Sequence, residues 1–112
     1  MTADQFRKLA LALPGATEAA HMGHPDFRVG GKIFATLTSD GARGMVKVSP
    51  REQKALLRAA PEVFEPASGA WGRKGCTMVC LRKAKKGIVV PAMVAAWRNL
   101  APTDLIEEFE DQ

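Results

Sequence analysis

Cysteine and long hydrophobic runs are both scarce in this sequence of 112 residues, and each shortage excludes a class of protein. Cys76 and Cys80 are the only cysteines, so no disulfide framework is expected. The longest apolar run, residues 88–96, is interrupted by Pro91 and is far shorter than the roughly 20 residues of a membrane span. The N-terminal residues lack the apolar core of a signal peptide. We therefore expect a cytoplasmic protein that does not interact with a membrane.

A chain of this length is expected to fold as one small domain with one core between two layers. Hydrophobic residues make up 46% of the chain and charged residues 25%, which is typical of a folded globular protein. No repeat, low-complexity segment or linker divides the sequence. We predict a single domain over residues 1–112, in which residues 102–112 form an acidic tail or a short helix.

The charge is distributed unevenly along the chain. Sixteen Lys and Arg residues against twelve Asp and Glu residues give a net charge of +4. Five of the acids lie in the last eleven residues, so residues 1–101 carry sixteen bases against seven acids, a net charge of +9. A basic body with an acidic end favours an anionic partner, of which nucleic acid is the first candidate. The alternative is a lysine-rich surface that only keeps the protein in solution.

Capping signals predict where two helices begin. Thr2 and Gln5 form a capping box, in which each side chain accepts a free backbone N–H, ahead of an apolar stripe over residues 3–13. Ser49, followed by proline and then by Glu52, is the same signal for a second helix.

Glycine turns between β-forming runs predict the strands. Gly30-Gly31 lies between residues 27–29 and 32–37, a pattern typical of a tight hairpin. Residues 16–26 are expected to form a loop. The remaining expected elements are a strand over 44–48, a short edge strand over 63–66, a basic loop over 68–75, a central strand over 76–81 and a long helix between the basic tract 82–87 and Pro102.

The resulting order, α-β-β-β-α-β-β-α, predicts an α+β fold of two layers, an antiparallel sheet with its helices packed on one face. The other face of the sheet is then left to solvent or to a partner. Residues on that open face are the natural place for function.

Pairs of histidines and cysteines raise the question of a metal or catalytic site. His21-x-x-His24 and Cys76-x-x-x-Cys80 contain residue types that bind zinc. On one strand, however, the two cysteines would lie about 13 Å apart, whereas two ligands of one zinc usually lie within about 4 Å. No acid or amide is placed by the sequence to orient either histidine as a base. We expect no metal site, no cofactor and no catalytic residue, and we interpret the cysteines as small core residues.

Basic side chains from three segments favour nucleic-acid binding, with double-stranded DNA as the candidate ligand. No recognition helix and no pair of aromatic residues is evident, so we expect mainly phosphate-backbone contacts. Trp71, in the basic loop, is interpreted as a cover over the core rather than a ligand contact. The predicted nucleic-acid-binding residues are Lys32, Arg43, Lys47, Arg73, Lys74, Arg82, Lys83, Lys85 and Lys86.

Several segments, taken in order, carry a resemblance to a known family. They are GHPDFRVGGKIFATL at residues 23–37, VKVSPREQ at 46–53, the segment from Phe64 to Gly75, and the pairs Ala96-Trp97 and Ala101-Pro102. Together they resemble the MmcQ/YjbR family over almost the whole chain. One departure is Cys76, which stands where many members of the family have tryptophan.

The resemblance implies an α+β fold related to the secretion-chaperone and frataxin-like (CyaY-like) architectures. It also implies a DNA-binding role and brings no established catalytic residue. The resulting hypothesis is an uncharacterised, non-enzymatic DNA-binding protein that acts as a monomer. The alternative is a protein-interaction or chaperone-like adaptor that uses the open sheet face or a sheet edge and has no nucleic-acid role.

Overall fold

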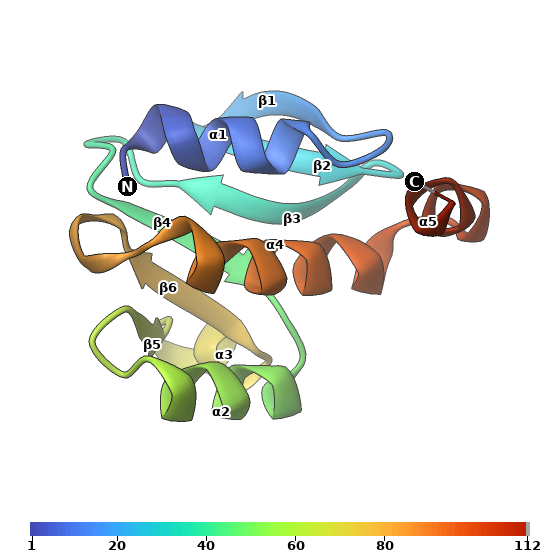
Figure 1. Cartoon of the computed structure of the whole chain (residues 1–112). Coiled ribbons are helices and arrows are strands. Elements are labelled where there is room, and N and C mark those ends of the chain that lie inside the picture. Colours follow the sequence, from blue (N-terminus) through green and yellow to red (C-terminus); the bar gives the residue numbers. More distant parts are fainter. Residues whose placement is uncertain (112) are drawn as a thin grey trace.

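A computed structural model describes residues 1–111 of the chain; the last residue of the predicted tail, Gln112, lies outside the described residues. Figure 1 shows one sheet with helices packed against it, which is the predicted α+β class. The elements are α1 (Ala3–Leu11), β1 (Thr17–His21), β2 (His24–Val29), β3 (Lys32–Leu37), β4 (Arg43–Lys47), α2 (Pro50–Ala59), β5 (Phe64–Pro66), α3 (Gly69–Arg73), β6 (Cys76–Cys80), the 3-10 helix η1 (Leu81–Lys83), α4 (Lys86–Leu100) and α5 (Thr103–Glu110).

Both predicted capping boxes are confirmed. At the start of α1, the Thr2 hydroxyl accepts the Gln5 backbone N–H at 3.1 Å, and the Gln5 side chain accepts the Thr2 N–H at 2.8 Å. At the start of α2, Ser49 and Glu52 make the same two bonds at 3.1 and 2.8 Å. Each box satisfies backbone donors that the first turn of a helix leaves free.

The six strands form one antiparallel sheet in the order β1-β2-β3-β4-β6-β5. Strand β6 lies between β4 and β5, so the predictions of a central strand and a short edge strand are both confirmed. Gly30 and Gly31 both have positive φ angles, 59° and 78°, and join β2 to β3 in the predicted tight hairpin.

The predicted loop over residues 16–26 is wrong, because this segment contains β1 and the start of β2. The two strands are joined at Met22-Gly23, where φ is 49° and 79°, as a tight hairpin turn requires. All five residues of β1 are exposed, so the strand has no alternation of apolar and polar residues to reveal it. Pairing with β2 stabilises β1, and local sequence preference does not.

The predicted basic loop over residues 68–75 is also wrong in part, since it contains the short helix α3. Gly72 lies so close to the backbone that a Cβ atom there would be 1.8 Å from the Ala67 carbonyl oxygen. The Gln53 side-chain amide, buried beneath α3, donates to the Gly72 and Cys76 carbonyls, both at 3.0 Å. These contacts hold α3 in a fixed position at the start of β6.

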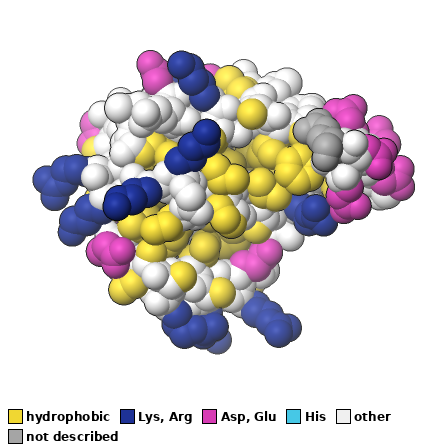
Figure 2. Space-filling view, viewed as in Figure 1, with side chains coloured by type: hydrophobic (Ala, Val, Ile, Leu, Met, Phe, Trp, Pro, Cys, Tyr) yellow, Lys and Arg dark blue, Asp and Glu magenta, His cyan; other side chains and the backbone are white. Residues whose placement is uncertain are grey.

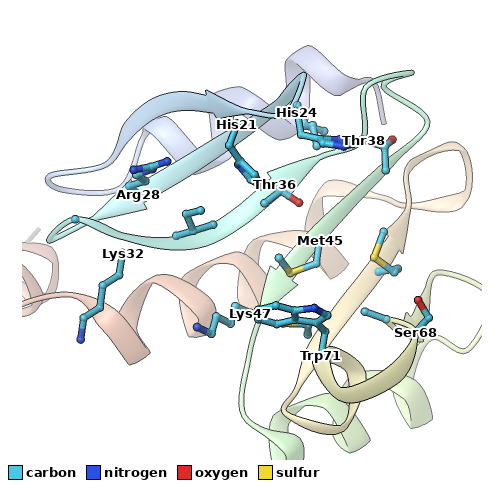
Figure 3. Close-up of a pocket in the computed structure, with 16 residues that line it drawn as sticks. His21, His24, Arg28, Lys32, Thr36, Thr38, Met45, Lys47, Ser68 and Trp71 are labelled. Atoms are coloured by element: carbon cyan, nitrogen blue, oxygen red, sulfur yellow. The ribbon is translucent and has the colours of Figure 1, made fainter.

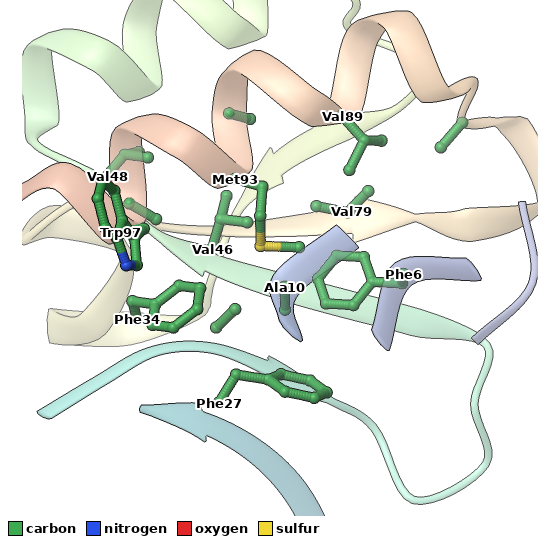
Figure 4. Packing of buried hydrophobic residues seen from close by; sticks show 14 of the residues in the cluster. Phe6, Ala10, Phe27, Phe34, Val46, Val48, Val79, Val89, Met93 and Trp97 are labelled. Atoms are coloured by element: carbon green, nitrogen blue, oxygen red, sulfur yellow. The ribbon is translucent and has the colours of Figure 1, made fainter. Parts of the chain in front are cut away.

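The core lies between the sheet and the helices α1 and α4 (Figure 4). Phe6 of α1 packs against Phe27 of β2, with ring centroids 6.3 Å apart. Trp97 of α4 is fully buried, and its indole N–H donates to the Pro14 carbonyl at 2.9 Å. Because these helices cover one face, most of the opposite face of the sheet is left open, as predicted. The short helix α3 lies against that opposite face, however, so not every helix packs on one face.

The acidic end of the chain forms the helix α5, so the prediction of a short helix holds for the described residues. Phe109 packs on Trp97 with ring centroids 5.3 Å apart, and Glu110 pairs with Arg98 at 3.1 Å. Figure 2 shows acidic side chains gathered over α5. Within residues 1–111, no helix combines the length and the apolar character needed to span a bilayer.

Candidate functional site

The open face of the sheet holds a groove of about 680 Å³, which we call the sheet-face groove (Figure 3). Its position follows from the strand register: Thr36, Met45 and Met78 are aligned side by side across β3, β4 and β6. In an antiparallel sheet, aligned residues point to the same face, so these three side chains form one row of the floor. Ile33 and Cys76 extend the floor along the same face.

Two elements form the walls of the groove. His21 and His24, in the β1–β2 hairpin, line one side, with ring centroids 6.1 Å apart. Trp71 of α3 lines the other side, and 65% of its surface is exposed. The interpretation of Trp71 as a cover over the core is therefore wrong, because the indole borders the groove on the open face. The Lys74 ammonium lies 5.9 Å from the centre of the indole ring.

The charged side chains that line the groove are cations. They are Arg28, Lys32 and Lys47, and among the residues of 1–111 that line the groove none is an aspartate or glutamate. Figure 3 shows Lys47 beside Trp71, whereas Lys32 and Arg28 lie towards the β2–β3 side of the groove. A ligand that spans the groove would meet positive charge at both sides of an apolar floor.

The structure brings together only some of the nine predicted nucleic-acid-binding residues. Lys32 and Lys47 line the groove, and Arg73 and Lys74 follow Trp71 at the end of α3. Arg43 starts β4 and is paired with Glu65 of the neighbouring β5, at 3.2 Å.

The other four predicted residues lie elsewhere. Arg82 and Lys83 belong to η1, and Lys85 and Lys86 stand at the start of α4; we call these four the η1–α4 bases. Lys85 and Lys86 line a separate hollow that they share with Lys8 of α1. On the helix-covered face, Lys and Arg side chains are spread over several places and do not form one continuous patch (Figure 2). The nine predicted residues therefore do not lie on one surface, although many of them are close together in the sequence.

A histidine–aspartate pair beside the groove was missed at the level of sequence, where no acid was expected to orient either histidine. His21 Nδ1 lies 2.7 Å from a carboxylate oxygen of Asp26. Arg28 donates to the same carboxylate twice, at 2.8 and 3.1 Å. The available signal was the hairpin itself, because the turn at Met22-Gly23 folds His21 back towards the residues that follow His24.

Asp26 is fully buried, so its charge depends on these partners. The hydrogen bonds from Arg28 lower the pKa of Asp26, burial opposes this, and the hydrogen bond with His21 again lowers it. The carboxylate in turn raises the pKa of Arg28. The Arg28–Asp26 pair is therefore close to neutral, and the net positive charge of the groove lining comes from Lys32 and Lys47.

The two cysteines lie four residues apart on β6, and only Cys76 lines the groove. Burial raises the pKa of the Cys76 thiol, although the charges of Lys47 and Lys74 partly oppose this. A raised pKa keeps the thiol protonated and weakly nucleophilic near neutral pH. Across residues 1–111, no three side chains of His, Cys, Asp or Glu lie close enough together to hold a metal ion.

Comparison with known proteins places the chain in a family. Its sequence matches the YjbR family over residues 11–107, which is most of the chain. The chain belongs to the YjbR family. The crystal structure of protein DR2400 from Deinococcus radiodurans, with a DUF419 domain, shares this fold: 20% of residues are identical, and the TM-score is 0.75. The structural match covers 92% of the present chain and 80% of the DR2400 chain. No curated protein matches the sequence.

Proposed function

We propose that this YjbR-family protein binds nucleic acid in the sheet-face groove, without catalysis, through contacts between its lysines and backbone phosphates. The observation that carries the proposal is the groove itself, a concave site on the open sheet face whose charged lining residues, Arg28, Lys32 and Lys47, are all cations. A polyanion is the ligand class that matches this charge over an extended surface.

The contacts available in the groove favour backbone recognition. Lysine provides a flexible point charge, and phosphate contacts of this kind position a nucleic acid without reading its sequence. Because the groove holds few cations, we expect modest affinity and a correspondingly modest fall of affinity with salt, since each neutralised phosphate adds only about 0.7–0.9 to the slope of log K against log salt. We therefore propose binding with weak sequence preference.

The test compares two double variants that remove the same charge from different places. Lys32→Ala with Lys47→Ala removes two groove cations, and Lys85→Ala with Lys86→Ala removes two of the η1–α4 bases. All four lysines are exposed, so both variants should fold as the wild type does. Binding of a labelled oligonucleotide is followed by fluorescence anisotropy over a series of salt concentrations.

The groove variant should bind more weakly and should flatten the slope of log K against log salt by up to about 0.7–0.9 per lysine removed. The variant at the start of α4 should keep the wild-type slope. Loss of binding only in the Lys85/Lys86 variant would place the ligand elsewhere. Absence of salt-sensitive binding by the wild-type protein at low salt would contradict nucleic-acid binding altogether.

A second candidate function, a protein-interaction adaptor, is favoured by the edge strand β1. All five of its residues are exposed, and it is one of the two edge strands of the sheet. Such an edge can accept an extended peptide as an additional strand through backbone hydrogen bonds. A peptide bound in this way would show weak dependence on salt and no response to the Lys32/Lys47 variant, which distinguishes the two candidates.

A further inference from the structure

We propose that the groove accepts single-stranded nucleic acid, with one unstacked base lying on the indole of Trp71 and the neighbouring phosphates against Lys47 and Lys74. This inference rests on the proposed function and specifies the form of nucleic acid that the groove takes. It is carried by the combination of an exposed aromatic ring, an apolar floor and flanking cations in one concave site.

Trp71 is presented on a fixed support. The side-chain amide of Gln53 ties α3 to the start of β6, because it donates to the Gly72 and Cys76 carbonyls at 3.0 Å each and to the Thr77 hydroxyl at 3.2 Å. Gly72 itself is wedged against the Ala67 backbone. An aromatic ring that is 65% exposed yet held by a rigid element loses little conformational freedom when a planar ligand stacks on it.

The floor of the groove suits the face of a base. Met45, Met78 and Ile33 are half-buried apolar side chains of three adjacent strands. Methionine is flexible and polarisable, and it packs well against flat aromatic surfaces. A base with one face on Trp71 and the other towards these side chains would remove apolar surface from water on both partners.

A duplex cannot use these features. Its bases are stacked inside, and it presents charged phosphates on a convex surface, so the apolar floor would face no apolar partner. A single strand exposes base faces and backbone together, and stacking on aromatic side chains is the general mode by which proteins hold such strands. The groove's shape and apolar content therefore favour the single strand over the duplex.

The charges around Trp71 are placed to accept the backbone next to the stacked base. Lys74 lies 5.9 Å from the indole centre, and Figure 3 shows Lys47 beside the same ring. Lys32 continues the positive charge across the groove towards β3. The charge of Asp26 is offset by the guanidinium of Arg28, which donates two hydrogen bonds to its carboxylate.

The test uses the intrinsic fluorescence of the protein with three probes: an oligothymidylate of about 12 nucleotides, within the usual range of site sizes, a hairpin duplex of the same length, and thymidine monophosphate. Trp97 is fully buried, so quenching by a stacked base reports on Trp71. We expect the single strand to quench the fluorescence and to bind at least tenfold more tightly than the duplex or the mononucleotide.

Trp71→Ala should weaken single-strand binding by roughly tenfold or more and abolish the quenching, whereas Trp71→Phe should recover part of the affinity. Leu11→Ala is the matched control, since Leu11 is also an exposed apolar side chain, 39% accessible, but lies on α1 outside the groove. Circular dichroism confirms that each variant is folded.

The outcomes separate the two proposals. Absence of binding by single strand and duplex alike at low salt overturns the proposed function. A second outcome overturns only the single-strand inference. In that outcome, binding is salt-sensitive, the duplex binds as tightly as the single strand or more tightly, and Trp71→Ala does not change the affinity. Equally tight binding of thymidine monophosphate also overturns it, because the site would then recognise a free nucleotide rather than a strand.

Discussion

Asp26 shows how a single buried charge organises the edge of the sheet. It is the only fully buried acid among residues 1–111, and its carboxylate accepts hydrogen bonds from His21 and Arg28 on the open face. Removing one partner of a buried, charged hydrogen-bond cluster leaves the others without their partners. The cluster therefore fixes the ring of His21 and the guanidinium of Arg28 where they border the groove.

Asp26→Asn should lower the free energy of unfolding near neutral pH by about 1–3 kcal/mol. The native pKa of Asp26 is lowered below its ordinary value of 3.8 by the hydrogen bonds from Arg28, so the stabilisation is fully present above that value and is lost as pH falls through the native pKa. The difference between variant and wild type should therefore narrow below about pH 4. Urea unfolding of both proteins at pH 7 and pH 3 measures the difference in their free energy of unfolding. A difference that is the same at both pH values would contradict a stabilising role for the Asp26 charge.

At the scale of helices and strands, the sequence predicts correctly those elements whose start or turn is determined by a few neighbouring residues. Capping boxes at Thr2 and Ser49 and the glycine pair at Gly30-Gly31 act within a few residues, and all three are present in the structure. Strand β1 and helix α3 were missed because neither has a strong local signal: β1 is exposed at all five positions, and α3 has no side-chain cap. The first is held by pairing with β2, and the second by Gln53, nineteen residues before its partner Gly72.

Gly72→Ala tests whether α3 is held as described. A Cβ atom at this position would lie 1.8 Å from the Ala67 carbonyl oxygen, so the helix must move away from its support. We expect a loss of about 2 kcal/mol or more in stability and weaker quenching by the oligothymidylate, because Trp71 moves with α3.

Gly87→Ala is the matched control for this substitution. A Cβ atom at Gly87 meets nothing within 4 Å, and alanine favours the helix α4, so the stability should stay equal or rise slightly. Denaturation curves for the two variants give the comparison. Equal stabilities would show that the close approach of Gly72 to Ala67 does not constrain α3.

At the scale of the whole molecule, the fold separates charges that the sequence places close together. Five of the twelve acids lie in α5 and the residue that follows it, at one end of the molecule. The η1–α4 bases lie around the start of α4, and the groove lies on the face of the sheet opposite α1 and α4. Lys74 and Arg82 are eight residues apart in sequence, yet β6 runs between them along the sheet. Sequence alone predicted the open face as the functional side. It did not predict which cations lie there, because strand register and the position of α3 decide that.

The most direct test of the account is to map where the ligand binds. Nitrogen-15 NMR spectra of the protein, recorded while oligothymidylate is added, report on each backbone amide and on the two indole N–H groups. The account predicts that the NMR signals of the Trp71 indole N–H and of the Lys47 and Met78 amides shift. The amide signals of Lys85 and Lys86, at the start of α4, should not change. Shifts confined to the start of α4, with the sheet-face groove unchanged, would contradict it.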